Sequence, residues 1–179
     1  MPEMRKHLAL VALTPFRERL AADLVNAVEK RGCEVTECRI MPLGQQFSAS
    51  LLISGNWSAL GKLESALPGL AEALELEILS AHTQPTEDAT DYRPYAAEII
   101  APQHGKLLGE LLSFFGTQDV RVIEINAQAY ESGYTGAALT NINLALHVPL
   151  NQHPQTLREA FMDLCDDLHA DGLLDPIKT

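Results

Sequence analysis

Few side chains in this chain have the types and the spacing that catalysis needs. The three cysteines are Cys33, Cys38 and Cys165. Cys33 and Cys38 lie close together in a stretch that is typical of a strand, where side chains of different parity point to opposite faces. We therefore expect these two thiols to face apart and not to share a zinc ion, and the sequence contains no Cys-x-x-Cys pair.

The histidines and the acidic residues give no catalytic pattern either. No two of the six histidines stand three or four positions apart on one expected helix face. An acidic stretch of the kind that usually faces solvent contains Glu159, Asp163, Asp166 and Asp167. The Gly-x-Ser-x-Gly motif, a phosphate-binding glycine loop and a dinucleotide fingerprint are all absent from the sequence. We expect no metal, no cofactor and no enzymatic activity.

Two turns are better placed to hold a ligand, because each leads from an expected strand into an expected helix. A helix N-terminus presents unpaired N–H groups and a partial positive charge, which suit a carboxylate. Arg17 could add a charge-assisted bond, although an ordinary surface arginine is the simpler interpretation. Gly105 would let a ligand approach the backbone closely, or it could be a plain turn glycine. The candidate ligand-binding residues are Thr14, Pro15, Phe16 and Arg17 in the first turn and Gln103, His104 and Gly105 in the second.

The elements that must position these turns follow one pattern twice. Apolar runs and period-two alternation predict strands, and apolar residues three and four apart predict helices. The first half has the order β-α-β-β-α-β over residues 7–13, 20–28, 35–41, 47–53, 57–67 and 74–78. The second half repeats that order over residues 95–101, 107–115, 120–127, 138–148, 157–168 and 173–178. Gly32, and Pro68 with Gly69, are expected to end the two helices of the first half.

The two halves can be overlaid by counting. Leu24 shifts by 87 positions to Leu111, whereas Leu60 shifts by 97 to Leu157. A constant offset that changes once is expected after duplication and one insertion, and we expect the ten extra residues in the hairpin over 130–138. The pattern predicts an α+β fold of two tandem ferredoxin-like units, each an antiparallel sheet with helices on one face.

A segment poor in large apolar side chains separates the two units. We expect a first domain over 1–81, a linker over 82–93 and a second domain over 94–179.

The strand that follows the first helix of each unit carries apolar side chains on both of its expected faces. In the first unit, Cys38 and Ile40 share one face and Val35 and Met41 share the other. In the second unit, we expect Ile123 and Ile125 to lie opposite Val122. Because large apolar patches usually mark interfaces, we expect the two halves, or two copies of the chain, to pack by sheet faces or sheet edges.

The charge of the chain argues against direct contact with nucleic acid. The 24 acidic residues exceed the 13 basic residues, for a net charge of −11. DNA binding draws on cations that neutralise phosphates, and anionic membranes would repel such a chain in the same way. No stretch of about 18 apolar residues is present, and the first six residues lack the apolar core of a signal peptide. With an odd number of cysteines, these features favour a cytoplasmic protein with reduced thiols.

Three features of the sequence resemble a known family. The repeated element order, the stretch RGCEVTECRIMPLGQQFSASLLISGNWSAL over 31–60 and the leucine-rich helix that begins at Leu107 resemble the glycine cleavage system transcriptional repressors. Those proteins consist of two tandem ACT domains. The resemblance implies a non-enzymatic regulator that acts through a DNA-binding activator protein, without direct nucleic-acid or membrane contact. It also implies a response to glycine or another amino acid, bound near the first strand–helix turn.

The chain departs from the family at that turn. ACT turns commonly contain Asp-Arg-Pro-Gly, and the matching positions here are Phe16, Arg17, Glu18 and Arg19. The arginine is kept and the glycine is lost. The second turn keeps Gly105, so we expect it to be the better ligand site.

Two other functions fit the same scaffold, since one fold hosts many functions. An amino-acid-binding sensor module that controls a metabolic enzyme is the main alternative. An acylphosphatase-like hydrolase would need an arginine and a positioned asparagine; Arg17 is present, but Asn26 falls within an expected helix. The sequence leaves open the effector, the surface that a partner would contact, and whether the chain forms a homo-oligomer.

Overall fold

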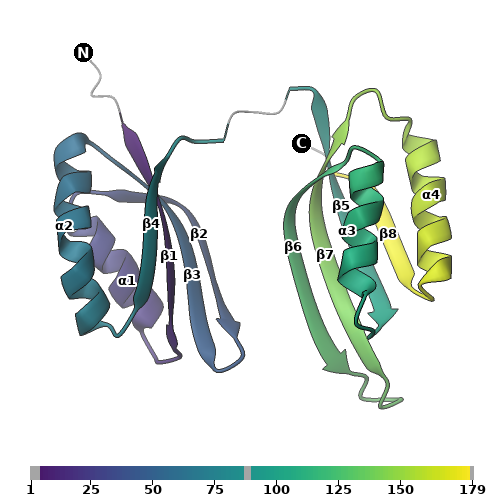
Figure 1. Cartoon of the computed structure of the whole chain (residues 1–179), viewed down its shortest axis with the longest axis horizontal. Helices are drawn as coiled ribbons and strands as arrows, with labels where there is room; N and C mark the ends of the chain where they lie inside the picture. The colour runs from purple at the N-terminus through teal and green to yellow at the C-terminus, as the bar shows by residue number, and fades with distance from the viewer. Residues whose placement is uncertain (1–4, 87–89, 178–179) are drawn as a thin grey trace. The chain divides into compact units, whose positions relative to one another are not determined.

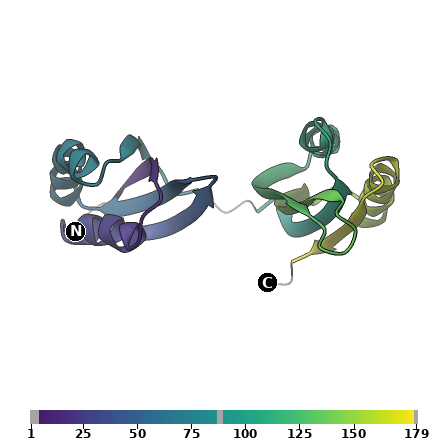
Figure 2. The same cartoon turned by 90° about the horizontal axis from the view of Figure 1, so that it is seen from below.

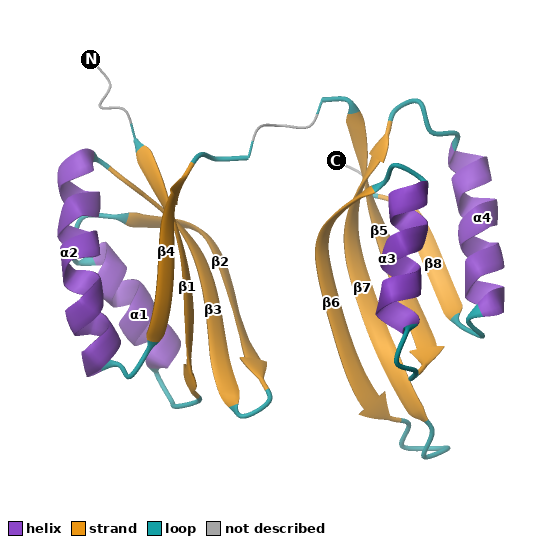
Figure 3. Ribbon diagram, viewed as in Figure 1, coloured by secondary structure: helices purple, strands orange, loops and turns teal. Residues whose placement is uncertain are grey.

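The computed structural model describes residues 5–86 and 90–177. The chain divides into two compact units, Met1–Glu87 and Asp88–Thr179. Each unit has one four-stranded antiparallel sheet with two helices on one face (Figures 1 and 3). The predicted α+β fold, with the β-α-β-β-α-β order twice, is confirmed. The division into 1–81, 82–93 and 94–179 stays a proposal, and its linker includes residues 87–89, which lie outside the described residues.

The first domain has its two helices on the same side of the sheet (Figure 2). Its elements are β1 (Lys6–Pro15), α1 (Leu20–Glu29), β2 (Glu34–Leu43), β3 (Gln46–Gly55), α2 (Trp57–Ala73) and β4 (Glu77–Thr83). The strand order in the sheet is β2-β3-β1-β4. Alternate residues of β1 are buried toward the helices, where they meet the apolar stripes of α1 and α2. This core includes Leu8, Leu10, Leu24, Ile53, Leu60 and Leu63.

The second domain repeats this arrangement. Its elements are β5 (Tyr92–Pro102), α3 (Leu107–Thr117), β6 (Arg121–Glu131), β7 (Ala138–Pro149), α4 (Pro154–Asp167) and β8 (Asp171–Pro176). The strand order is β6-β7-β5-β8. The core is centred on the stacked rings of Phe115 and Phe161, whose centroids lie 6.1 Å apart. The last strand spans Asp171–Pro176 and so begins earlier than the expected range of 173–178.

An irregularity of the backbone recurs at the same place in both domains. The pairing of β2 with β3 shifts register between Val35 and Glu37, and that of β6 with β7 shifts between Val122 and Glu124. The two β-bulges are separated by the offset of 87 that relates the helices α1 and α3. A bulge needs a specific local backbone, so its repetition supports duplication of one ancestral unit.

The expectation of one ten-residue insertion is wrong, because the extra residues fall in two places. Ile53 lies opposite Leu8 in the first sheet, and Leu146 lies opposite Tyr95 in the second. The offset between β3 and β7 is therefore 93, so six of the extra residues belong to the hairpin. The remaining four lie around the end of β7. This strand runs one residue further than β3, and four residues separate it from α4, where the first domain has only Asn56.

Because of the bulge, the side chains of β2 do not lie on the faces that the sequence predicts. Val35 and Cys38 lie opposite Ile53 and Leu51, whose side chains are buried beneath the helices. Val35 and Cys38 therefore share the helix-covered face, because the extra residue at the bulge changes the parity. Cys33 is buried in the core beneath the helices, so the two thiols lie on the same side of the sheet.

The same correction applies in the second domain. Val122 and Ile125 lie opposite Leu146 and Leu144, which are both buried. Val122 and Ile125 therefore share the helix-covered face, and Ile123 is the extra residue at the bulge.

The second helix of the first domain is longer than its sequence predicts. Pro68 lies inside α2, which continues to Ala73, and β4 begins only at Glu77. The residues after Pro68 stay helical because Leu70 and Leu74 pack against the core, which offsets the cost of an internal proline. The alternation around Leu74 thus belongs to a helix end and not to a strand.

Each helix in the described residues is followed by one residue with a left-handed backbone. These residues are Gly32, Glu75, Asp119 and His169, with φ of 79°, 50°, 55° and 51°. Such a residue reverses the chain after a helix, and the next residue returns toward the core. The prediction that Gly32 ends the first helix is confirmed.

Candidate functional site

The first candidate turn joins β1 to α1. Thr14 is buried at the end of β1, and the Phe16 side chain is 63% exposed. The backbone N–H of Phe16 donates to the carbonyl oxygen of Gln45, 3.2 Å away. The turn is therefore tied to the β2–β3 hairpin, and Phe16 is the side chain that it leaves open to solvent.

Arg17 is already engaged within its own domain. Its guanidinium donates a hydrogen bond to the carbonyl oxygen of Leu74, which follows the last turn of α2. A second guanidinium nitrogen lies 3.8 Å from the Glu75 carboxylate. A ligand carboxylate would have to compete with both of these groups for Arg17.

Arg19 occupies the position where ACT turns commonly have glycine. Its φ is 66°, a conformation that favours glycine. It is the N-cap of α1, and the structure records no side-chain cap bond to the first amides of this helix within the described residues. The backbone has kept the glycine-type turn, although the residue has become an arginine.

The second candidate turn joins β5 to α3. The backbone N–H of Gln103 donates to the Ala138 carbonyl oxygen at 3.0 Å. The Lys106 backbone N–H lies 3.4 Å from Nδ1 of His104. A Cβ added to Gly105 would meet no described atom within 4 Å, so the backbone there is open.

A groove between α3 and α4 begins at this turn. Its volume is about 710 Å³. Its lining residues are Gly105, Lys106, Gly109, Glu110, Ser113, Phe114, Thr117, Leu164, Asp167 and Leu168. Of the three candidates in the second turn, Gly105 lines the groove, whereas Gln103 and His104 do not. The other lining residues of α3 recur every three or four positions from Lys106 to Thr117, a helical spacing that could have identified them in the sequence.

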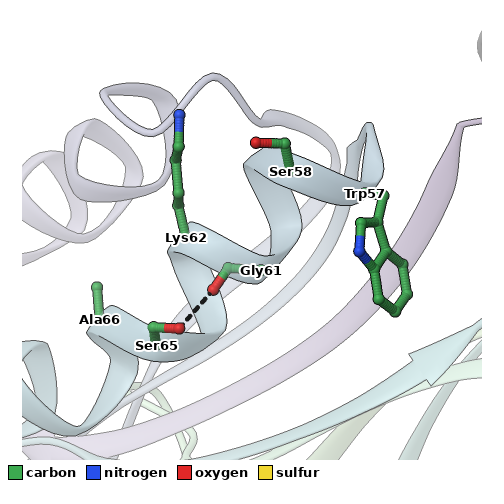
Figure 4. Close-up of a pocket in the computed structure, with 6 residues that line it drawn as sticks. All are labelled: Trp57, Ser58, Gly61, Lys62, Ser65 and Ala66. Carbon is green, nitrogen blue, oxygen red and sulfur yellow. Dashed lines mark hydrogen bonds between the residues drawn. The ribbon is translucent and has the colours of Figure 1, made fainter.

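A second hollow, of about 690 Å³, lies on the outer side of α2 near its N-terminus (Figure 4). Trp57, Ser58, Gly61, Lys62, Ser65 and Ala66 line it. The Lys6 ammonium at the start of β1 lies 4.6 Å from the centre of the Trp57 ring. Because the ten residues of β1 span roughly 30 Å, this hollow lies at the end of the domain away from Arg17. It does not belong to the candidate turn.

The two buried thiols are poor nucleophiles. Cys33 and Cys165 are buried, and burial raises the pKa of both thiols, that of Cys165 to about 11. Cys38 is exposed, and all three are free. Within residues 5–86 and 90–177, no group of three or more His, Cys, Asp or Glu side chains is placed to hold a metal ion. None of the helices in those ranges combines the length and the apolar character that crossing a membrane requires.

The first domain matches a known protein family. Residues 15–80 match the ACT domain family. This range runs from the end of β1 into β4 and includes the first candidate turn except Thr14. The match identifies an ACT domain in the first half of the chain, and the second half repeats the same βαββαβ fold.

The predicted resemblance to the glycine cleavage repressors is also confirmed. The chain is 23% identical over 171 residues to the glycine cleavage system transcriptional repressor of Escherichia coli (strain K12), across 96% of this chain and 90% of that protein. The repressor of the same name from Shigella flexneri gives the same values.

Two solved structures share the fold over nearly the whole chain. One, provisionally named a glycine cleavage system transcriptional repressor, has a TM-score of 0.72 and 24% identity over 98% of this chain and 99% of its own. The other is a protein of unknown function from Galdieria sulphuraria, with a TM-score of 0.76 and 17% identity over 98% of this chain and 100% of its own. At these identities the likeness shows the fold alone.

Proposed function

We propose that this chain is a non-enzymatic regulator that represses glycine-cleavage genes through a DNA-binding protein partner in the cytoplasm. The observation that carries the proposal is similarity to the Escherichia coli repressor over 96% of this chain and 90% of that protein. Similarity across both domains favours a shared function more strongly than a match to one domain would.

The charge of the chain supports action through a partner. The net charge of −11 opposes approach to phosphates, which attract lysine and arginine. This charge supports a repressor that reaches DNA through another protein. The proposal therefore includes a DNA-binding activator as the partner.

We further propose that the second candidate turn binds an amino-acid effector, glycine or another. The structure records no side-chain cap bond to α3 from its N-cap, Lys106, and the open backbone of Gly105 adjoins the groove. The uncapped N-terminus suits a carboxylate, and Glu110 and Asp167 in the groove suit an ammonium group. In the first turn Arg17 is engaged and Arg19 replaces glycine, so it is less suited to a ligand.

The alternative function, a sensor that controls a metabolic enzyme, differs from the repressor only in its partner. The groove beside Gly105 supports both functions equally. The hydrolase is not carried forward, because Arg17 is held by the end of α2 and Asn26 lies on α1.

A binding measurement separates the two functions. The chain is immobilised and exposed to the purified activator of the glycine-cleavage genes, and in parallel to amino-acid biosynthetic enzymes from the same organism. The repressor proposal predicts saturable binding of the activator that a chain with an unrelated fold does not reproduce. Binding to an enzyme and not to the activator would support the sensor instead.

A further inference from the structure

We infer that the open face of the first domain's sheet is a self-association surface, on which a second copy of this chain packs face to face. This open face is the side of β2-β3-β1-β4 away from the helices. Its centre is apolar, with Val11 directly opposite Leu79 across β1 and β4. Val11 is 49% exposed and Leu79 is 77% exposed. The open face also contains the apolar residues Ala9, Leu13, Met41, Leu43, Leu52 and Ala81.

The valine at the centre of this face is particular to the first domain and is not required by the fold. Val11 lies between Ser50 on β3 and Leu79 on β4. The equivalent row in the second domain places Glu98 between Asn143 and Leu173. The fold therefore tolerates a charged residue at the position equivalent to Val11. Burial of Val11 against another protein surface explains the valine better than a requirement of folding does.

Charges at the two edges of the open face specify how two copies would meet. Arg39 on β2 lies in the row of Val11, and Glu77 on β4 lies in the next row. Packed sheets keep their strands within about 30° of each other, and a dimer of identical copies has a two-fold axis. When this axis runs along the strands, β2 of each copy lies over β4 of the other. Arg39 of each copy then comes near Glu77 of the other copy, so the two-fold axis gives two such pairs.

A two-fold axis across the strands would instead place β2 over β2. The nearest acid to Arg39 would then be Glu37, which already lies 3.4 Å from Arg39 within its own strand. Glu77 makes no ion pair within the part of the chain that the structure describes. The arrangement that sets Arg39 against Glu77 therefore adds two ion pairs, and we adopt it.

The size of the open face suits a weak dimer. Four strands about 4.8 Å apart and about nine residues long give a face of about 19 by 30 Å. Two copies would bury about 1,100 Å² in total, near the lower end of specific interfaces. We therefore expect a dissociation constant in the micromolar range.

Self-association through the open face does not depend on the proposed repression, since either could hold without the other.

Sedimentation of the full chain over about 5–500 μM tests the inference. The wild-type chain should pass from monomer to dimer in this range. Val11→Glu, which copies the residue of the second domain, and Leu79→Asp should each weaken dimerisation at least tenfold. Leu173→Asp, at the equivalent place in the second domain, is the matched control and should leave it unchanged. A wild-type monomer at all concentrations, or dimerisation that resists both substitutions, would overturn the inference.

Charge reversal tests the arrangement of strands. Arg39→Glu and Glu77→Arg should each weaken dimerisation about fivefold or more, and the double variant should restore it. A double variant as weak as the single ones would overturn the placement of β2 over β4. Thermal melts of all variants show whether the monomer remains folded, and activator binding, measured separately, reports on repression alone.

Discussion

The guanidinium of Arg17 donates a hydrogen bond to the carbonyl oxygen of Leu74, so the turn after β1 is joined to the end of α2. The bond connects two segments that are 57 residues apart in the chain. Arg17 is the one residue that the first turn shares with the common ACT pattern, and here it binds the end of α2 in its own domain.

We predict that Arg17→Ala lowers the free energy of unfolding by about 1 kcal/mol, because a carbonyl loses its charged donor at a partly exposed site. Urea unfolding measures this change, and Lys62→Ala on the exposed side of α2 is the control. If Arg17→Ala left stability unchanged and abolished an amino-acid response, Arg17 would be a ligand-binding residue instead.

Arg19→Gly should stabilise the first domain. An L-residue with φ of 66° is strained by about 1–2 kcal/mol, and glycine relieves this at the cost of some chain entropy. We expect a gain of roughly 0.5–1 kcal/mol in urea unfolding. Lys106, the N-cap of α3, has φ of −114°, so Lys106→Gly is the matched control and should give no gain. Equal effects of the two substitutions would contradict the role of backbone strain.

Gly105→Val tests the proposed effector site. The added side chain meets open space, so the melting temperature without ligand should change little. In the wild-type chain, an amino acid at about 100 times its dissociation constant should stabilise the fold by about 2.7 kcal/mol. The variant should lose this thermal shift, whereas Arg17→Ala should keep it. A panel of amino acids that leaves the wild-type melting curve unmoved would remove the support for an effector.

Cys165 should make stability fall at alkaline pH. Burial, followed by the charges of Asp166 and Asp171, raises the pKa of this thiol from 9.0 to about 11. Between these values the unfolded chain loses the proton while the folded chain keeps it. The free energy of unfolding should therefore fall as pH rises from 9 to 11, by at most about 1.4 kcal/mol per pH unit.

Urea unfolding at pH 8, 9, 10 and 11 measures this slope. Cys165→Ala is expected to be less stable at every pH and to lose this part of the slope. Cys33, whose pKa burial also raises, remains in both proteins and contributes equally. Identical slopes for wild type and variant would show that Cys165 does not titrate in this way.

The architecture was predictable because the apolar periodicity occurs twice. The stripe of Leu20, Leu24 and Val28 recurs as Leu107, Leu111 and Phe115, and both sets are buried. Burial of such stripes is the main source of helix stability in proteins, so the pattern and the structure agree.

The errors fall where tertiary contacts override local patterns. A β-bulge leaves no distinct residue signature, so simple alternation wrongly separates Val35 from Cys38 and Val122 from Ile125. Pro68 normally ends a helix, but Leu70 and Leu74 extend α2 by packing on the core. The engagement of Arg17 depends on the position of Leu74, which local sequence does not indicate. The groove beside Gly105 needs α4, which begins 49 positions later at Pro154.

The central claim, regulation through a protein partner without direct DNA contact, is tested most directly by fluorescence anisotropy of labelled glycine-cleavage promoter DNA. The chain is added alone, and then to a preformed complex of the DNA with the purified activator. We predict no change with the chain alone at physiological salt, and a saturable change when the activator is present. Saturable, sequence-specific binding of the chain to DNA without the activator would contradict the claim.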